Sequence, residues 1–251
     1  MSLRHIAFLV AYDGSEFCGS QRQSNGRSVQ GELERALEAV LKVPTPVILA
    51  GRTDAGVHGT GQVARFSTEN ESLPAQRVPL ALNAVLDRAV RTRDAWEVDE
   101  NFHPRFSAKS RIYRYRIEQS KTPNPMLRTI AASIRDELNL EAMHAAAVPL
   151  LGRQDFKAWQ SSGSPAPTTI REVKRLEIIQ TRAFDSSLIE IEIEADAFLY
   201  QMVRNIVGAL IEAGRGHISS EDVARLTAGL DRTKCPPPAP PQGLCLVQVN
   251  Y

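Results

Sequence analysis

The feature that most constrains the fold of this chain is one order of strand and helix patterns that occurs twice. In each half, a strand is followed by a helix, two strands, a second helix and a final strand. In the first half, Ser28 suits a helix N-cap, apolar residues then recur at helical spacing, and Pro44 predicts the helix end. The first-half elements are predicted at residues 4–11, 29–41, 47–50, 62–67, 78–86 and 95–98.

The second half repeats this order. Its clearest strand has Glu190, Glu192 and Glu194 alternating with apolar residues, as expected where one face of a strand is buried. The elements are predicted as strands at 111–118, 172–179, 187–195 and 244–249, a helix capped by Asn139, a helix over 198–211 and a short extra helix from Ser219.

Two successive β-α-β-β-α-β patterns predict an α+β fold built from two ferredoxin-like halves. The halves are expected to form a continuous, mainly antiparallel sheet with helices on one face. We place the first half at residues 1–105, with the candidate catalytic loop, and the second at residues 106–251, with a basic and aromatic strand.

The composition narrows the class of protein. The chain has 251 residues, 43% of them hydrophobic, and a formal net charge of +1, so total charge argues neither for nor against nucleic acid. Its apolar runs are too short to span a bilayer, and no signal-peptide segment is evident. Three cysteines without a Cys-x-x-Cys pair, and scattered histidines, predict a cytoplasmic protein with reduced thiols and no bound metal.

Residues 51–59 form a glycine-rich loop around one acid, Asp54, with Arg52 and His58 beside it. Glycine allows unusual backbone angles and close approach of another molecule, and a nearby guanidinium favours an ionised carboxylate. Such a carboxylate suits a nucleophile or a general base. The alternative interpretation is an ordinary turn that Asp54 begins.

The same region contains a G-x-G-x-x-A pattern from Gly59 to Ala64 that resembles a dinucleotide-binding fingerprint. That fingerprint requires a helix directly after the glycines, so that the pyrophosphate meets a helix N-terminus. Here the following residues, 62–67, predict a strand. We therefore exclude nicotinamide and flavin binding.

Residues 111–116 predict a strand with arginine and tyrosine in alternation, and Arg105 and Lys109 precede it. Arg111 and Tyr113 share one face, whereas Arg114 lies on the other. Aromatic rings can stack on bases while arginines neutralise phosphates, which suits RNA binding. The alternative is an edge strand that its charges protect from aggregation.

Arg204 stands inside an apolar run, where a buried arginine needs an acidic partner, and Asp54 is a candidate. The alternative is a surface arginine that reaches water. Arg22 lies in a polar, glycine-containing segment that could touch a polyanion.

Together these segments resemble the tRNA pseudouridine synthase A family, and the resemblance covers essentially the whole chain in order. Its most specific block is Arg52-Thr53-Asp54-Ala55-Gly56-Val57-His58-Gly59. The matching pieces are residues 12–15, 21–23, 51–62, 102–108, 111–115 and 202–208, with Gly152, Asp155, Phe156, Gly243, Leu244 and Tyr251.

The resemblance implies the pseudouridine synthase fold and isomerisation of uridine to pseudouridine in the tRNA anticodon stem-loop, at tRNA positions 38, 39 and 40. It also implies a homodimer without metal or organic cofactor. Asp54 would be the catalytic aspartate, Tyr113 would stack on the target uracil, and Arg52 and Arg204 would be basic partners of the aspartate. Further candidate RNA contacts are Arg22, His58, Arg105, Arg111 and Arg114.

The residues leave three points open: the route of Asp54, the effect of Ser20 and the alternative function. Asp54 could attack the sugar C1′ or assist loss of the C2′ proton to give a glycal, and the target base must leave its stack in either case. The chain carries Ser20 where family members usually carry tryptophan. The alternative function is a catalytically inactive RNA-binding protein of the same fold.

Overall fold

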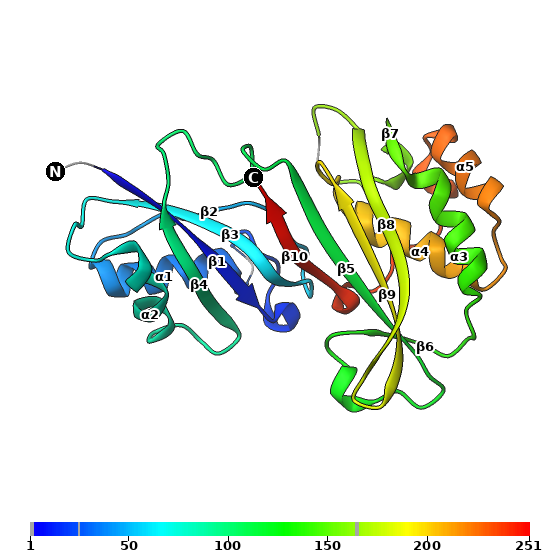
Figure 1. The fold of residues 1–251 in the computed structure, drawn as a ribbon, viewed down its shortest axis with the longest axis horizontal. Helices are drawn as coiled ribbons and strands as arrows, with labels where there is room; N and C mark the ends of the chain where they lie inside the picture. The colour runs from blue at the N-terminus through cyan, green and yellow to red at the C-terminus, as the bar shows by residue number, and fades with distance from the viewer. Residues whose placement is uncertain (1–2, 25, 164–165) are drawn as a thin grey trace. The chain divides into compact units, whose positions relative to one another are not determined.

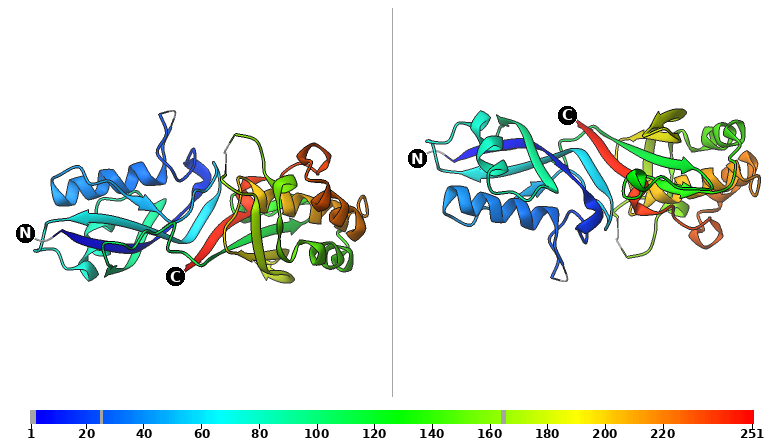
Figure 2. Two further views of the ribbon diagram at one scale, coloured as in Figure 1. Left: turned by 90° about the horizontal axis from the view of Figure 1, so that it is seen from above. Right: turned by 90° about the horizontal axis from the view of Figure 1, so that it is seen from below.

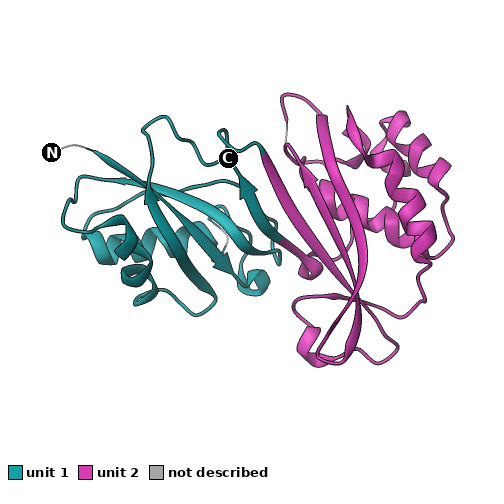
Figure 3. Ribbon diagram, viewed as in Figure 1, with its two compact units in different colours: residues 1–109, 246–251 teal, residues 110–245 magenta. Residues whose placement is uncertain are grey.

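The computed structural model describes residues 3–24, 26–163 and 166–251. Contacts within the chain divide it into two compact units (Figure 3). Unit 1 comprises residues 1–109 and 246–251, and unit 2 comprises residues 110–245. The contacts thus group residues 106–109 and 246–251 with unit 1, whereas the sequence placed them in the second half. The division into domains 1–105 and 106–251 stays a prediction.

Unit 1 has the predicted order of elements (Figure 1). Its strands pair in the order β4-β1-β3, and β2 also pairs with β3, outside this order. The pairs β1–β3, β1–β4 and β2–β3 are antiparallel. The elements are β1 (Arg4–Tyr12), α1 (Val29–Leu41), β2 (Ile48–Leu49), β3 (His58–Thr68), α2 (Val78–Asn83) and β4 (Val90–Glu97).

Alternation along β1 creates two apolar layers in unit 1. Ile6 and Phe8 face the main core, which includes residues of α1 and α2, and Figure 2 shows α1 on one side of the strands. Ala7 belongs to a smaller cluster on the other face, to which Tyr251 also contributes. The period of two along a strand explains this separation. In unit 1, both helices therefore cover the same face, as predicted.

Unit 2 repeats the pattern with additions. β10 begins in unit 2 and continues into unit 1. The strand order within unit 2 is β5-β9-β8-β7, with β6 parallel to β5. The elements are β5 (Ser110–Gln119), β6 (Ala132–Ile134), α3 (Leu140–Ala147), β7 (Gly152–Asp155), β8 (Ile170–Ala183), β9 (Ser186–Ala195), α4 (Met202–Gly214), α5 (Ser220–Gly229) and β10 (Leu244–Asn250).

The α+β prediction with a mainly antiparallel sheet is confirmed, and several details differ from expectation. β4 begins at Val90 and not at residue 95, and α2 ends at Asn83 and not at residue 86. The short strands β6 and β7 were not predicted. The predicted helix over 198–211 begins only at Met202, because Gln201 has left-handed backbone angles, with φ of 57°. β5 is an inner strand, so the edge-strand interpretation is wrong. Short 3-10 helices occupy Gly14–Glu16, Ala75–Arg77, Pro125–Leu127, Val148–Leu150, Lys157–Trp159, Arg232–Lys234 and Pro241–Gly243.

Within the described part of the chain, no helix has the length and apolar character needed to cross a membrane.

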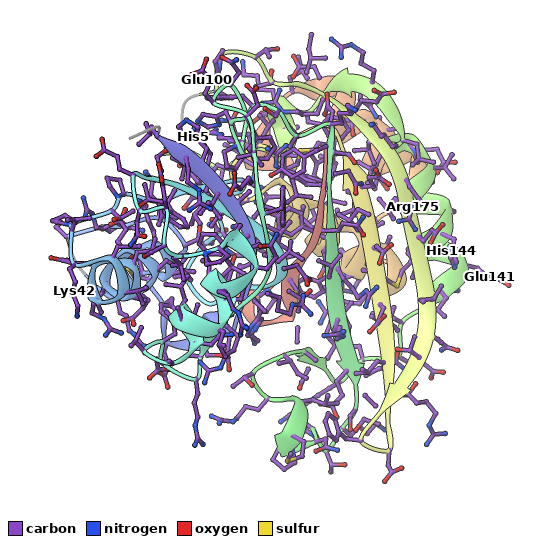
Figure 4. All side chains as sticks on the ribbon, turned by 60° about the vertical axis from the view of Figure 1, so that its left-hand side comes forward. His5, Lys42, Glu100, Glu141, His144 and Arg175 are labelled. Atoms are coloured by element: carbon purple, nitrogen blue, oxygen red, sulfur yellow. The ribbon has the colours of Figure 1, made fainter. Side chains whose placement is uncertain are left out.

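Charges pair across the strands of unit 2. Arg114 on β5 lies opposite Glu192 on β9, and their side chains are 2.8 Å apart. Arg175 on β8, labelled in Figure 4, reaches the same carboxylate at 2.6 Å. Burial on its own raises the pKa of Glu192, but hydrogen bonds from both arginines and their charges outweigh burial and hold that pKa below its ordinary value of 4.5.

These pairs predict a specific loss of stability in acid. Because the pKa of Glu192 is lower in the folded state, its contribution is complete above about pH 4.5 and is lost as the pH falls below that value. Glu192→Gln is therefore expected to flatten the fall in unfolding free energy below about pH 4.5, as measured by urea denaturation over a pH series. Glu71→Gln, at an exposed loop position, is the control. An unchanged acid profile in Glu192→Gln would contradict this account.

Candidate active site

The loop with Asp54 lies between β2 and β3, as predicted. Asp54 is half-buried, whereas Arg52 is exposed. The backbone N–H of Val57 donates to the carbonyl of Asp54 at 3.1 Å, and Gly56 between them has φ of +77°. Asp54 therefore begins a tight turn that needs glycine at its third position. The prediction that Asp54 begins a turn is therefore correct. The turn fixes the backbone that carries the Asp54 carboxylate.

Ser20 holds the residue before Asp54 from both sides. Its side chain is fully buried, and its Oγ accepts a hydrogen bond from the N–H of Thr53 at 2.8 Å. The N–H of Ser20 donates to the carbonyl of Thr53 at 3.0 Å. These two bonds fix the peptide groups on either side of the Thr53 Cα, so they restrict where the Asp54 backbone can lie.

Tyr12 and Gln62 complete the support of the loop. The Tyr12 hydroxyl is 2.8 Å from Thr53 Oγ1. The side-chain amide of Gln62 is fully buried and forms two hydrogen bonds with the backbone of Gly51, as a residue on a paired strand would. Its Oε1 accepts from the N–H of Gly51 at 3.0 Å, and its Nε2 donates to the carbonyl of Gly51 at 2.8 Å. Buried polar groups are costly unless they are paired, so these bonds favour one loop conformation.

Gly14 packs directly under the far end of the loop. Its N–H donates to His58 Nδ1 at 3.0 Å, and an added Cβ would lie 2.1 Å from the carbonyl oxygen of Val57. His58 is buried, and its Nδ1 is also 3.2 Å from Asp13 Oδ1. The position therefore requires glycine, because any side chain would collide with backbone of the Asp54 loop.

The glycines of the G-x-G-x-x-A pattern have packing roles. Gly59 and Gly61 lie inside β3, and no helix follows them, which agrees with the exclusion of a dinucleotide fingerprint. A Cβ on Gly59 would lie 2.5 Å from the Tyr12 ring, and one on Gly61 would lie 2.1 Å from the carbonyl oxygen of Val247 on β10. Close approach of these neighbours explains both glycines.

The second group of predicted residues belongs to unit 2. Tyr113 is buried on β5, and its ring meets that of Phe198 edge-on, with centroids 5.1 Å apart. Arg111 is also buried and donates to the carbonyl of Asp196 at 3.1 Å. Arg204, in the first turn of α4, donates through Nε to the carbonyl of Ala239 at 2.8 Å. The pairing of Arg204 with Asp54 stays a prediction.

The other candidate RNA contacts have different surroundings. Arg22 has a largely exposed side chain that contacts Glu34 at 2.9 Å. Arg105 is exposed in a turn before β5. Arg114 is engaged with the glutamates of β9, and His58 is buried against Gly14. Contact of these four side chains with RNA stays a prediction.

Comparison with known proteins decides the family. The sequence profile of a family described as tRNA pseudouridine synthase matches residues 8–107 and 146–251. This chain belongs to the tRNA pseudouridine synthase family. A protein of Citrifermentans bemidjiense named tRNA pseudouridine synthase A is 41% identical over 250 residues, which cover 99% of this chain and 98% of that protein. The resemblance seen in the motifs is thereby confirmed.

Other relatives of the synthase family match over the same length. The tRNA pseudouridine synthase A of Thermoanaerobacter sp. strain X514 is 42% identical over 249 residues, 99% of this chain and 100% of that protein. The protein of the same name from Roseiflexus castenholzii is 43% identical over 249 residues, 99% of this chain and 91% of that protein.

Among the described residues of this synthase-family chain, no His, Cys, Asp and Glu side chains form a group of three or more that could hold a metal ion.

The residues that support the loop were missed as functional residues in the sequence. Gln62 and Tyr12 were part of the family match, but neither periodicity nor spacing assigned them a role. Ser20 was noted only as a departure from tryptophan. The sequence feature that could have indicated this support is the pair of glycines at positions 14 and 19, because glycine in a short polar segment indicates close backbone contact.

Ser20→Ala is expected to destabilise the protein by about 1–3 kcal/mol, because the buried N–H of Thr53 loses its acceptor. Chemical denaturation measures the loss. Ser72→Ala removes an exposed hydroxyl that donates to Asn70 Oδ1, and it should change the unfolding free energy by less than about 0.5 kcal/mol. Equal effects of the two substitutions would show that Ser20 does not support the loop.

Proposed function

We propose that this protein isomerises uridine to pseudouridine in tRNA and that Asp54 acts on the ribose of the target nucleotide. The observation that carries the proposal is the support of the Asp54 loop. Four side chains, those of Tyr12, Ser20, His58 and Gln62, hold this loop or the segments packed on it. Catalysis favours groups whose position is fixed before the substrate arrives. The names of the full-length relatives support the reaction and the substrate class.

The chemistry suits a carboxylate. The bond from C1′ to N1 of the base breaks, and a bond from C1′ to C5 forms. The proton leaves C5 and N1 gains one, so the overall reaction needs no oxidant or reductant. Asp54 can attack C1′ as a nucleophile, or it can take the C2′ proton so that a glycal forms. Both routes require an ionised carboxylate close to the ribose.

The remaining roles follow from the chemistry of each side chain. The target uridine must leave the RNA stack, and Tyr113 would then support the turned-out uracil. Arg52 and Arg204 would favour the ionised state of Asp54, since a nearby positive charge lowers the pKa of a carboxyl group. Arg22, His58, Arg105, Arg111 and Arg114 are proposed as further RNA contacts.

We assign the reaction to uridines at positions 38, 39 and 40 of the anticodon stem-loop, on the resemblance of the sequence motifs to the family. The same resemblance supports a homodimer in the cytoplasm that works without a cofactor.

Tritium release from tRNA labelled at uracil C5 tests the proposal, because the C5 proton leaves during the reaction. The native protein is expected to release tritium from the anticodon stem-loop uridines. Intact tRNA binding without any release would overturn the enzymatic function and favour an inactive RNA-binding protein of the same fold.

A further inference from the structure

Phe106 is an exposed aromatic side chain outside the Asp54 loop. Its exposed fraction of 76% exceeds that of every other large hydrophobic side chain in the described residues. Single exposed apolar residues are common on protein surfaces, so exposure alone does not indicate a function. The arrangement around Phe106 is more informative.

Two neighbours form a surface with Phe106 that we call the aromatic shelf, made of His103, Arg105 and Phe106. The rings of His103 and Phe106 have centroids 4.3 Å apart and planes inclined by 33°. The guanidinium carbon of Arg105 lies 5.7 Å from the centroid of the Phe106 ring, within the range of a cation–π interaction. The shelf thus combines flat π surfaces with a positive charge.

Hydrogen bonds make the turn under the shelf rigid. His103 Nδ1 accepts from the N–H groups of Arg105 and Phe106 at 3.1 and 3.3 Å. These bonds require an unprotonated Nδ1 and fix the orientation of the imidazole ring. Ser107 closes the turn, since its Oγ accepts from the N–H of His103 at 3.0 Å and its N–H donates to the carbonyl of His103 at 2.9 Å.

The base of the turn is anchored in unit 1. The Tyr251 hydroxyl donates to the carbonyl of Pro104 at 2.9 Å, and the rings of Tyr251 and Phe102 have centroids 4.8 Å apart. An exposed ring on a fixed turn loses little conformational entropy when a ligand binds, so it is suited to binding.

We propose that the aromatic shelf binds an unpaired base of the RNA substrate, with the base stacked on Phe106 and Arg105 beside its phosphate. The proposal rests on the proposed function, because it takes RNA as the substrate. Single-stranded RNA offers both partners that the shelf needs: a flat base for the rings and a negative charge for the guanidinium.

Phe106→Leu tests the proposal because leucine keeps an apolar side chain and loses the flat ring. The dissociation constant for an anticodon stem-loop RNA is expected to rise about tenfold, within the range measured for stacking on aromatic side chains. Phe106→Trp restores a flat ring and should bind within about twofold of the native protein. Affinity for an uninterrupted RNA duplex should change less than affinity for the stem-loop, because the duplex offers no unpaired base.

Phe184→Leu is the matched control, since Phe184 is 56% exposed between β8 and β9 in unit 2. It should leave stem-loop affinity unchanged. Native-like stem-loop binding by Phe106→Leu would overturn the proposal, and so would a change in oligomeric state without a change in RNA affinity. Binding is measured separately from tritium release. If the proposed catalytic function is wrong, the native protein will release no tritium, whatever the effect of Phe106→Leu on RNA binding.

Discussion

Asp54→Asn is expected to lower pseudouridine formation by at least about 10³-fold, while tRNA affinity stays within about twofold of the native value. The amide has nearly the size and shape of the carboxylate but can act neither as the proposed nucleophile nor as the proposed base. The turn is expected to persist, because it depends on the Asp54 carbonyl and on Gly56. Single-turnover tritium release measures the reaction, and filter binding measures affinity.

Asp99→Asn is the control for this change. Asp99 lies in unit 1, and its carboxylate accepts from the N–H of Asn101 at 2.9 Å, which an amide oxygen can also do. This variant should retain native turnover. Residual turnover of Asp54→Asn within about tenfold of the native protein would remove Asp54 from the catalytic role.

Gly14→Ala is expected to lower kcat by about 10²-fold in a protein that remains folded. The new methyl group would lie 2.1 Å from the carbonyl oxygen of Val57, so one of the two backbones must move. Movement of the Val57 backbone displaces the Asp54 loop directly. Movement of the Gly14 backbone disturbs the hydrogen bond that Gly14 donates to His58 at the end of that loop. A displacement of about 1 Å at a catalytic group can cost about 10²-fold in rate. Steady-state kinetics measures kcat, and circular dichroism verifies folding.

Gly229→Ala provides the comparison, because a Cβ at Gly229 meets nothing within 4 Å. It should leave both kcat and folding unchanged. A native kcat in Gly14→Ala would show that the loop tolerates displacement and that its support by the first segment is unimportant for catalysis.

Local patterns predicted most of the elements. The alternation of Glu190, Glu192 and Glu194 with apolar residues gave β9, and Ser28 capped α1 as predicted, accepting from the N–H of Gly31. These predictions succeeded because periodicity and capping depend on neighbouring residues. β6 and β7 escaped prediction because three or four residues are too few for a period to be recognised.

The sequence by itself determined the order of the elements, the family and the identity of the candidate acid, since each depends on residue types and their spacing. Only the tertiary structure decided how Asp54 is held. Ser20 forms a buried hydrogen bond with Thr53, which is 33 residues away in the sequence. Gln62 forms one with Gly51, which is 11 residues away. Such bonds form when distant segments pack together and lose water, and nothing in the local sequence records which partners will meet.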